Sequence, residues 1–588
     1  MRSHEIPALF CWMAGISGIC AAQTSQQPPE PVDIAPINGQ VYYLLNQLSG
    51  LNADLNNNST LAGDRIVQQQ PSFTSLSQRW TLTQVADGVW QIGNTGNGLC
   101  LASAGSARLC MPRNWGAREG AAAVRRSYTA SCPIVQDPCT STAVQQWSPI
   151  ATSNGYYMIV NKSTGLLIGL SQGATSAGAA LAESELLGGA TQSQQWLLRP
   201  AFLRGIDNAL LEKQEAARAA AGLPWWNDAG QQEDVLQMFR NHGINMVRLR
   251  PSSVPPYANV SQTGCSGNAC YGETDAQDLD LAKRAKNLGM SIEMTLLFDG
   301  GSSSSVPPGW ANNTQLSALQ SDLYNYVKAE ILSYRQAGTM PDLVSIGNEV
   351  DTGFLGAIGS PTGQDLGGFA ALQTTAMQAI RDAAADASIG PAIPAPLTCI
   401  HITPAWDLTQ FFTLANEFKI PYDAICQSYY PIYHGPLTDA QAAASNPGGK
   451  PVEQDVLVNA ANNIGKPIFI IETGEHYENG FDSNDPWYAP PSPALQSQFL
   501  QDLSGVVTGL PNNLGMGIEY WDPTGVDIHN AAGQLINGDN LPNAIYIWTG
   551  LTLFTDVDAS LLPGAEALGG GTQAGLVLKK TQNSGTKR

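Results

Sequence analysis

The stretch Leu343-Val-Ser-Ile-Gly-Asn-Glu349 is an apolar run that ends abruptly in an amide and a carboxylate. Apolar residues on both faces predict a strand buried in a parallel sheet, and the polar pair stands where such a strand surfaces at its C-terminal end. That end is where barrel enzymes keep their reactive groups.

A second stretch has the same design, because Pro467-Ile-Phe-Ile-Ile471 is followed directly by Glu472. Two carboxylates on the ends of separate parallel strands are what cleavage of a glycosidic bond requires, one as the acid and the other as the base or nucleophile. The alternative is that each Glu only caps a following helix. Because two such carboxylates occur at strand ends, we favour a catalytic role for Glu349 and Glu472 over helix capping.

Length and charge limit the possible functions. The chain has 588 residues and a net charge of −20, from 29 basic and 49 acidic residues. This length accommodates two domains when one of them is a barrel. The acidic balance argues against nucleic acid or an anionic membrane as a partner, whereas a neutral polysaccharide would not be repelled.

Residues 1–22 have the pattern of a secretory signal peptide: Arg2, then an apolar stretch from Ile6 to Ile19, then small residues before Gln23. A membrane anchor is the alternative, but the run is short for a bilayer span. We therefore expect a secreted, extracellular protein. The eight cysteines that follow would lie in an oxidising compartment, where disulfides form.

Two segments have the composition of flexible chain. Residues 23–38 are rich in Gln and Pro and are interpreted as a linker. Residues 565–588 include three consecutive glycines and end in Lys-Arg, and are interpreted as a flexible tail.

Between these segments, residues 39–199 contain a repeated triplet: Gln78-Arg-Trp80, Gln145-Gln-Trp147 and Gln194-Gln-Trp196. The spacing indicates an imperfect threefold repeat with an insertion in its first interval. The region resembles the ricin-type β-trefoil, a lectin-like carbohydrate-binding module. The resemblance implies that each Trp packs in a shared core and each Gln fixes a turn. Whether a lobe still binds sugar is left open by the sequence.

Four cysteines lie in this first region. Cys100 with Cys110, and Cys132 with Cys139, are close enough in sequence to join residues within single lobes. Small, loop-rich folds often need such bonds.

From residue 200 to 564 the chain alternates apolar strands with helical segments, which is the pattern of a parallel sheet. Eight such units predict a (β/α)8 barrel with long loops. The strands are expected at Phe202–Ile206, Ile244–Leu249, Ile292–Leu297, Leu343–Ile346, Leu397–Ile402, Ala424–Ser428, Pro467–Ile471 and Met516–Tyr520.

The barrel resembles glycoside hydrolase family 53, the arabinogalactan endo-β-1,4-galactanases of clan A. The most specific match is Ser428-Tyr-Tyr-Pro-Ile-Tyr-His-Gly435, which differs from the family's run by one aromatic exchange at Tyr433. The other matches are Arg204-Gly-Ile-Asp207, Val247-Arg-Leu-Arg250, Leu281-Ala-Lys-Arg-Ala-Lys286, His401, Gly347-Asn-Glu349, Glu472-Thr473 and Tyr520-Trp-Asp-Pro523.

The resemblance implies Glu349 as the general acid/base and Glu472 as the nucleophile of a retaining double displacement, which needs the two carboxyls about 5 Å apart. Arg248 is expected beside Glu472, where it would favour the charged form, while a raised pKa would keep Glu349 protonated. The alternatives for Arg248 are a purely structural ion pair, or that Arg250 takes its place.

The remaining site residues carry similar alternatives. Asn348 is expected to donate to a sugar hydroxyl or else to order its loop. His401 and Tyr430 are placed on the inner rim by resemblance, or are core residues. Trp521 would offer a flat platform to a sugar or pack in the core. Asp207 is expected to fix Arg248 or a neighbour rather than to touch sugar.

The chain also departs from the family. Where the third strand of the family ends in a His-Tyr-Ser-Asp run followed by Trp, this chain has Leu297-Phe-Asp-Gly300 and a Gly/Ser loop through Ser305, with Trp310 retained further on. Gly353-Phe-Leu-Gly356 lacks the Trp-Pro that usually follows strand four. The carboxylates therefore predict the chemistry more firmly than the cleft predicts the substrate.

Four barrel cysteines predict two further disulfides: Cys265 with Cys270 in the loop after strand two, and Cys399 with Cys426 on adjacent strands. A zinc site is the alternative, but the spacings fit it poorly. No cofactor is expected. The loop Asp482-Ser-Asn-Asp485 could hold a structural Ca²⁺, although a solvated turn is the simpler interpretation.

Three functions remain in competition. The first is a secreted galactanase whose lectin-like module holds it on galactan or arabinogalactan of plant cell walls. The second is a clan A glycosidase on another β-linked glycan. The third is a carbohydrate-binding protein without turnover, which the retention of Glu349 and Glu472 argues against. Oligomeric state, product length and glycosylation cannot be read from the sequence.

Overall fold

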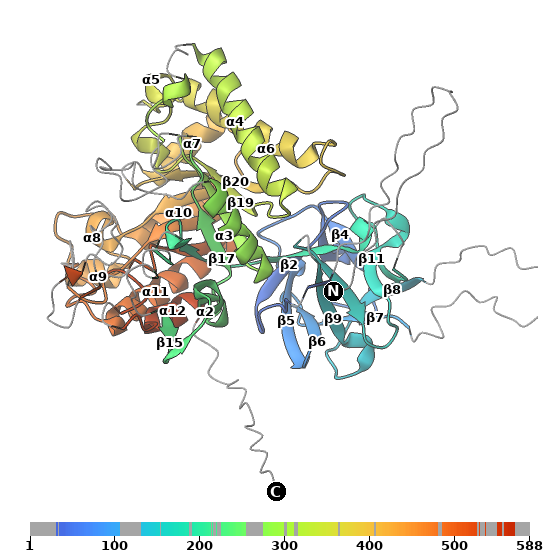
Figure 1. Ribbon diagram of the computed structural model, residues 1–588. Helices are drawn as coiled ribbons and strands as arrows, with labels where there is room; N and C mark the ends of the chain where they lie inside the picture. Colours follow the sequence, from blue (N-terminus) through green and yellow to red (C-terminus); the bar gives the residue numbers. More distant parts are fainter. Residues whose placement is uncertain are drawn as a thin grey trace, which may run out of the picture.

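The computed structural model describes residues 31–32, 34–105, 131–152, 155–186, 191–212, 214–215, 219, 225–253, 275–298, 303–310, 315–362, 365–404, 407–479, 485–525, 528–529, 535–536, 550–555 and 558–570. The predicted signal peptide, residues 1–22, lies outside this part of the chain, and so does the predicted disulfide between Cys265 and Cys270. Two folded bodies lie side by side (Figure 1).

The first body is all β and forms a trefoil, as predicted. Its strands form one 13-stranded antiparallel arrangement. They are β1 (Pro31–Val32), β2 (Val41–Asn46), β3 (Asn52–Leu55), β4 (Ile66–Gln69), β5 (Arg79–Ala86), β6 (Val89–Asn94), β7 (Cys100–Ser103), β8 (Ser131–Asp137), β9 (Trp147–Thr152), β10 (Tyr157–Asn161), β11 (Leu167–Leu170), β12 (Leu181–Ser184) and β13 (Trp196–Pro200).

The three triplet tryptophans meet in one core. Trp80, Trp147 and Trp196 are fully buried. Their indole N–H groups donate to the carbonyls of Ala53 at 3.1 Å, Leu101 at 3.0 Å and Ile168 at 3.0 Å, respectively. The core is therefore apolar while each indole N–H is satisfied.

The triplet glutamines fix turns, as the repeat predicts. Each ends a single 3-10 turn, in η2 (Leu76–Gln78), η3 (Ala143–Gln145) and η5 (Thr191–Gln194). The Gln145 amide, for example, accepts from the Thr140 backbone N–H at 2.6 Å and donates to the Pro138 carbonyl at 2.8 Å. An amide can do both because it carries donors and an acceptor.

The predicted disulfide pairing in the trefoil is wrong. Cys100 is bonded to Cys139, with Cα atoms 5.0 Å apart, so neither Cys100 with Cys110 nor Cys132 with Cys139 can form. Cys132 is also disulfide-bonded. The reason is strand pairing: β7 and β8 are antiparallel neighbours with Cys100 opposite Asp137, which brings Cys139 beside Cys100. Proximity in sequence does not decide such a bond when a sheet brings distant residues together.

The second body is a closed barrel of parallel strands, as predicted. Its strands follow in the order β14-β17-β18-β19-β20-β21-β22-β23, with β23 pairing back to β14. They are β14 (Leu203–Asp207), β17 (Met246–Leu249), β18 (Ser291–Leu296), β19 (Leu343–Ile346), β20 (Leu397–Ile402), β21 (Ala424–Ser428), β22 (Ile468–Thr473) and β23 (Gly515–Trp521). Cys399 and Cys426, on the paired strands β20 and β21, are disulfide-bonded.

Helices surround the barrel (Figure 1), and their apolar faces pack on the outer faces of the strands in one continuous core. They are α2 (Val235–Asn241), α3 (Asp275–Asn287), α4 (Leu316–Gln336), α5 (Gly356–Gly359), α6 (Gly367–Ala385), α7 (Leu408–Glu417), α8 (Pro431–His434), α9 (Asp439–Ala444), α10 (Glu453–Ile464), α11 (Pro493–Thr508) and α12 (Pro563–Gly569). The short pairs β15 (Asn227–Asp228) with β16 (Gln231–Gln232) and β24 (Ile528–His529) with β25 (Leu535–Ile536) lie outside the barrel sheet.

Several helices begin directly after a residue whose side chain caps the first turn. The Asp234 and Asp407 side chains accept from backbone N–H groups in the first turns of α2 and α7. Ser492 does the same for α11, with Pro493 at the first helical position. These contacts satisfy N–H groups that lack partners within the helix. Among the described residues, no helix has the length and apolarity needed to cross a membrane.

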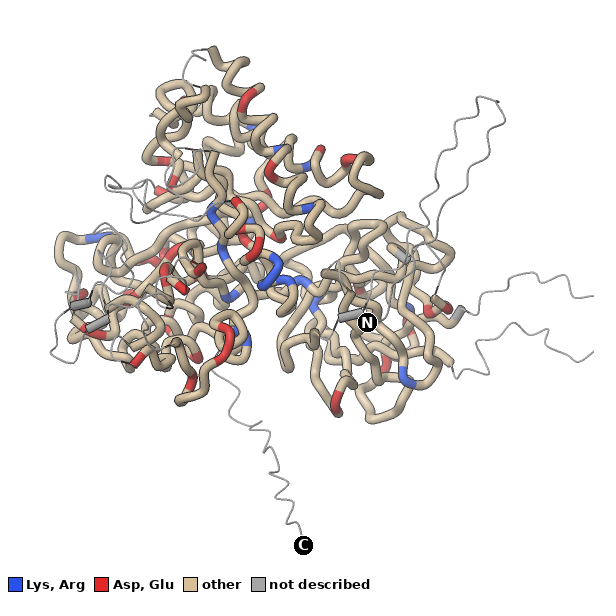
Figure 2. The backbone as a smooth tube through the Cα atoms, viewed as in Figure 1, with Lys and Arg blue, Asp and Glu red and all other residues tan. Residues whose placement is uncertain are grey.

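The trefoil lies against the N-terminal base of the barrel. Arg79 donates to the Asn513 carbonyl at 2.9 Å, just before β23, and Arg240 donates to the Ala35 carbonyl. Lys and Arg residues gather near this junction, whereas acidic residues are spread over the barrel (Figure 2). The opposite, C-terminal end of the barrel is therefore left clear of the trefoil.

Candidate active site

Glu349 lies three residues beyond the end of β19 in a strained backbone conformation. Its φ of 46° and ψ of 53° fall in the left-handed region, which is rare for a residue with a side chain. The preceding Gly347 has φ 92°, and a Cβ there would lie 2.5 Å from Val350. Glu349 precedes the short helix η8 (Val350–Thr352), but its side chain makes no capping bond. Strain of this kind is typical of functional positions.

Glu472 belongs to β22 itself and is held by an ion pair. The pairing of β22 with both neighbouring strands shifts register around this residue, and Ser428 lies opposite Glu472. Such irregularities re-aim side chains near active sites. Its carboxylate Oε1 accepts from Arg248 Nη1 at 2.7 Å, and both side chains are buried. Helix capping therefore explains neither carboxylate.

The two carboxyls are neighbours. One oxygen of Glu349, one oxygen of Glu472 and one ring nitrogen of His401 all lie within 4.8 Å of one another. Burial, together with the nearby charge of Glu472, raises the pKa of Glu349 to about 7, and a hydrogen bond from Ser428 opposes this shift. One carboxyl is thus arranged to keep a proton while the other is paired with a cation.

Arg248, on β17, is the cation that organises the site. Besides Glu472, its Nη1 lies 3.2 Å from Asp207 on β14. Its Nη2 donates to the Asn348 side-chain oxygen at 2.9 Å, and Arg250 donates to the same oxygen at 3.2 Å. With that oxygen engaged by two cations, the Asn348 amide nitrogen is the group left to donate to a ligand.

A hydrogen-bond relay supports Glu349. Ser428 donates to Glu349 Oε1 at 2.8 Å and lies 2.9 Å from His401 Nε2. Burial, and next the charges of Arg248 and Arg250, lower the pKa of His401 well below its usual value, so the ring is neutral. With Ser428 donating to Glu349, the neutral imidazole can donate to Ser428 through Nε2.

Ser428 was not singled out by the sequence, although it ends β21 and directly precedes the aromatic pair Tyr429 and Tyr430. Tyr430 follows two residues later and is buried, facing the charges of Glu472 and Glu349. Trp521, at the end of β23, is half-buried, and the Arg250 guanidinium lies over its ring at 4.7 Å from the centroid. All the residues expected at the site thus lie at one end of the barrel.

Glu349, His401 and Glu472 are close enough to share a metal ion, but their contacts fit another role. His401 Nε2 lies at hydrogen-bond distance, 2.9 Å, from the Ser428 hydroxyl, and Glu472 Oε1 accepts from Arg248 at 2.7 Å. The loop Asp482-Ser-Asn-Asp485, interpreted as a solvated turn with Ca²⁺ binding as the alternative, lies outside the described residues except for Asp485. One oxygen of Asp485 accepts from the backbone N–H groups of Trp487 and Tyr488.

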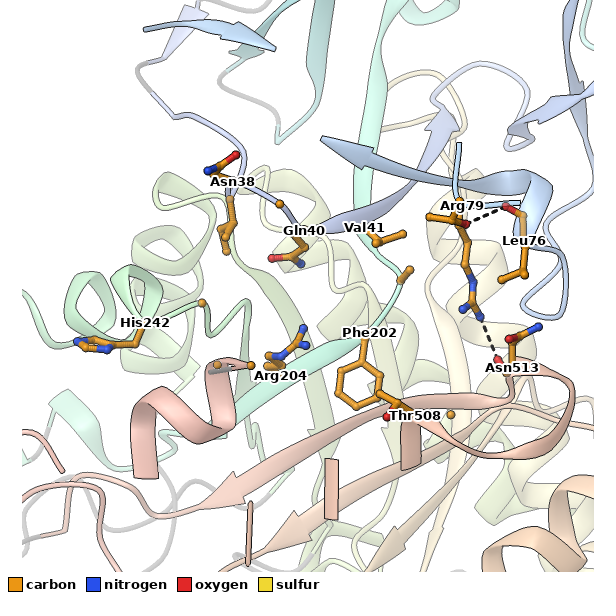
Figure 3. Close-up of a pocket in the computed structure, with 18 of the residues that line it drawn as sticks. Asn38, Gln40, Val41, Leu76, Arg79, Phe202, Arg204, His242, Thr508 and Asn513 are labelled. Atoms are coloured by element: carbon orange, nitrogen blue, oxygen red, sulfur yellow. Dashed lines mark hydrogen bonds between the residues drawn. The ribbon is translucent and has the colours of Figure 1, made fainter. Parts of the chain in front are cut away.

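A second concave region lies far from these carboxyls, between the trefoil and the base of the barrel (Figure 3). It is a cleft of about 460 Å³ whose lining includes Gln40 and Arg79 from the trefoil and Phe202, Arg204 and Asn513 from the barrel. Since barrel enzymes carry their chemistry at the other end, we do not assign catalysis to this cleft.

Comparison with known proteins agrees with this geometry. Residues 203–552 match the model of glycosyl hydrolase family 53, which covers more than half of the chain. The chain belongs to glycosyl hydrolase family 53. Residues 33–109 and 117–183 match the ricin-type beta-trefoil lectin domain-like family. The strands carrying Glu349 and Glu472 thus lie inside the hydrolase match.

Curated relatives of this family 53 chain include the probable arabinogalactan endo-beta-1,4-galactanase A of Aspergillus tubingensis. It is 27% identical over 60% of this chain and 94% of its own length. The endo-beta-1,4-galactanase of Bacillus subtilis is 24% identical over 56% of this chain and 71% of its own length. Among solved structures, the Ignisphaera aggregans GH53 catalytic domain matches 62% of this chain and 95% of its own, at 21% identity and a TM-score of 0.49.

Proposed function

We propose that this chain is a retaining endo-β-1,4-galactanase that acts on galactan or arabinogalactan. The observation that carries the proposal is the close approach of the Glu349 and Glu472 oxygens, within 4.8 Å, with a cation on Glu472 alone. Carboxyl groups about 5 Å apart leave no room for a water between Glu472 and the sugar, so the carboxylate itself attacks. The names of the curated relatives support the substrate.

In the first step Glu472 attacks the anomeric carbon while Glu349 gives its proton to the leaving glycosidic oxygen. The C–O bond to the leaving sugar breaks, and an ester bond to Glu472 forms. Arg248 donates to Glu472 Oε1 at 2.7 Å and so holds the carboxylate in position for the attack. The Asn348 amide is placed to bind a hydroxyl beside the reacting carbon.

In the second step the now ionised Glu349 takes a proton from water, and the water oxygen attacks the anomeric carbon. The ester bond breaks, Glu472 leaves as a carboxylate beside Arg248, and the sugar keeps its original configuration. Ser428 stabilises the ionised Glu349 of this intermediate, since it already donates to Oε1. The hydrogen bonds that link His401, Ser428 and Glu349 thus stabilise the second step, in which Glu349 is charged.

The trefoil would hold the enzyme on polysaccharide without forming part of the cleft. Its contacts are with the base of the barrel, as with Arg79 and Asn513, and the carboxyls lie at the other end. We further propose that the chain is exported, which the sequence of residues 1–22 and the disulfides support.

The test combines product release with stereochemistry. Purified protein is incubated with linear β-1,4-galactan, and proton NMR follows the anomeric configuration of the first product. We expect internal cleavage, β-configured products first, and no release by Glu349→Gln or Glu472→Gln. An α-configured first product would exclude the double displacement. Failure to release any sugar from galactan would exclude the substrate.

One observation favours a second substrate class. Leu297 and Phe298, which stand where the family has polar residues, are both buried, and Phe298 packs in the barrel core. This stretch therefore offers no polar side chain from those two positions to a sugar. A comparison of kcat/KM on galactan, arabinose-decorated galactan, β-glucan and mannan decides between the classes. A clear preference for glucan or mannan would assign the enzyme to another β-linked glycan.

A further inference from the structure

Two more carboxyls lie beneath the catalytic pair, against the inner edge of Arg248. Its Nε lies 3.2 Å from Glu293 Oε2 on β18 and 3.6 Å from Glu519 Oε1 on β23. Both carboxyls have no exposed surface. Arg248 therefore faces Glu472 and Asn348 with its terminal nitrogens and this lower pair with its inner nitrogen.

The fold makes room for the lower pair. A Cβ at Gly205 would lie 2.6 Å from Glu519 Oε2 and 2.7 Å from its Cγ, so only a glycine on β14 accommodates this side chain. Glu293 lies within 3.2 Å of the hydroxyl of Thr295 through both oxygens. Thr295 in turn lies 2.7 Å from Ser345 and accepts from Arg248 Nε at 2.8 Å.

The charges in this space cannot all be present at once. Asp207, Glu293, Glu472 and Glu519 surround a single guanidinium, and uncompensated buried charges cost several kcal/mol each. Asp207 and Glu472 lie toward the mouth and share Nη1. Neither oxygen of Glu519 has a hydrogen-bond donor, which is untenable for a buried carboxylate.

The titration behaviour agrees with this geometry. Burial raises the pKa of Glu293 to about 7, against the opposing charge of Arg248, and burial raises the pKa of Glu519 well above its ordinary value. The titratable and charged groups facing this pair of carboxyls are Asp207 from β14, Arg248 from β17 and, toward Glu519, Glu472 from β22. From β19 the neighbour is the hydroxyl of Ser345.

We propose that Glu293 and Glu519 are neutral carboxylic acids in the active enzyme, and that ionisation of Glu293 inactivates it by drawing Arg248 away from Glu472 and Asn348. Glu293 is thus a positioning residue that acts through Arg248, without touching substrate. The inference rests on the proposed function, since Glu472 must be the nucleophile for Arg248 to matter in this way.

The proposal predicts that two ionisations, not one, shape the alkaline side of the pH dependence of kcat/KM. The active form needs Glu349 protonated as the acid and Glu293 protonated to free Arg248, and both pKa values are about 7. Well above that pH, kcat/KM should fall about a hundredfold per pH unit, because two protons are lost. If Glu293 were only structural, the fall would be about tenfold, from Glu349 alone.

The deciding variant is Glu293→Gln, a neutral side chain of the same shape. We expect it to keep most of the wild-type kcat near pH 5.5 and to show the tenfold slope. Glu330→Gln is the matched control: Glu330, on α4, has a pKa raised to about 7 by burial and lies outside the barrel interior, so its loss should leave the steeper slope intact. Equal slopes in wild type and Glu293→Gln would overturn the proposal.

Two further measurements keep the test decisive. If Glu293→Gln does not fold, Glu293→Met provides a neutral side chain without hydrogen bonds, and the same slopes apply. Infrared difference spectra between pH 5.5 and 8.5 follow protonated carboxyls directly and need no substrate. Wild type should lose carboxylic-acid signal that Glu293→Gln lacks, and identical spectra would overturn the proposal even if the enzyme proves to act on another glycan.

Discussion

The trefoil and the barrel treat buried polar groups in different ways. In the trefoil core the polar residues are mainly neutral amides, and Gln78 donates to Asp54 and Gln70 while accepting from Asn52 and Ser72. Inside the barrel, by contrast, ionisable groups surround Arg248, and neither oxygen of Glu519 has a hydrogen-bond donor. Buried amides whose hydrogen bonds are all satisfied favour a single packing of the core. Buried carboxyls with few partners have perturbed pKa values, as groups at functional sites often do.

The difference also appears in the backbone. Left-handed residues with side chains in the trefoil, such as Asn57 and Gln172, lie in surface turns. In the barrel the same conformation occurs in exposed turns, as at Lys419 and Asn512, but also at Glu349 and at Asp522, directly after Trp521. The comparison predicts that substitutions in the barrel interior change activity and pH dependence, while those in the trefoil core change stability.

The largest effect is expected for Glu472→Ala. Loss of the attacking group should lower kcat at least about a thousandfold, and added azide should restore part of the turnover by entering the vacated space. The thermal transition of the barrel should survive, since Arg248 keeps Asp207 as a charged partner at 3.2 Å. Initial rates with and without azide are the measurement, and more than about a tenth of wild-type activity without azide would contradict the assignment.

The corresponding change in the trefoil is Trp147→Ala. It removes a fully buried side chain and its hydrogen bond to Leu101, so the free energy of unfolding of the trefoil should fall by about 3–5 kcal/mol. Leu61→Ala, at an exposed site, is the control. Calorimetry resolves the effect, and kcat on short oligosaccharides should not change. A parallel loss of kcat would mean that the two domains are coupled.

A smaller effect is expected at the relay. Ser428→Ala removes a hydrogen bond that stabilises the charged form of Glu349, so the pKa of Glu349 should rise above about 7. The alkaline limb of kcat/KM should move to higher pH, and kcat should fall about tenfold because the ionised intermediate loses its donor. The exposed Ser388→Ala is the control. A limb that moves to lower pH would contradict the direction of this bond.

Much of the fold was predictable because its signals are local. The apolar runs of β19, β20 and β21 are bounded by polar or turn residues, and their limits were predicted to the residue. Glu349 and Glu472 could be found because a carboxylate at the end of a buried strand is conspicuous. The triplet tryptophans were equally visible because they repeat.

What escaped prediction depends on contacts between distant strands. The bond of Cys100 to Cys139 follows from the pairing of β7 with β8, which no sequence interval reveals. Ser428 has no signal of its own, since a serine at a strand end is ordinary. Glu293 and Glu519 interrupt apolar strands and could have been noticed as buried charges, but their common partner Arg248 emerges only when the barrel closes.

The last and smallest prediction concerns Glu183, which departs from the pattern of the trefoil. This carboxyl on β12 is buried, accepts from Ser103 at 2.7 Å and Thr164 at 3.2 Å, and burial raises its pKa to about 7. Because the folded-state pKa lies above the unfolded value, ionisation is penalised only in the folded protein. The trefoil should therefore lose stability as pH rises from about 4.5 to about 7.

Glu183→Gln should remove that loss, because the amide is neutral at every pH and can still accept from Ser103. We expect it to match wild type near pH 4.5 and to exceed it at pH 8 by on the order of 1 kcal/mol in free energy of unfolding. Glu185→Gln, two residues away and exposed, should show no such difference. Denaturant titrations at both pH values measure it. If Glu183→Gln is the less stable protein at pH 8, the ionised form of Glu183 is favoured by folding rather than penalised, and the contrast between the trefoil and the barrel fails at this residue.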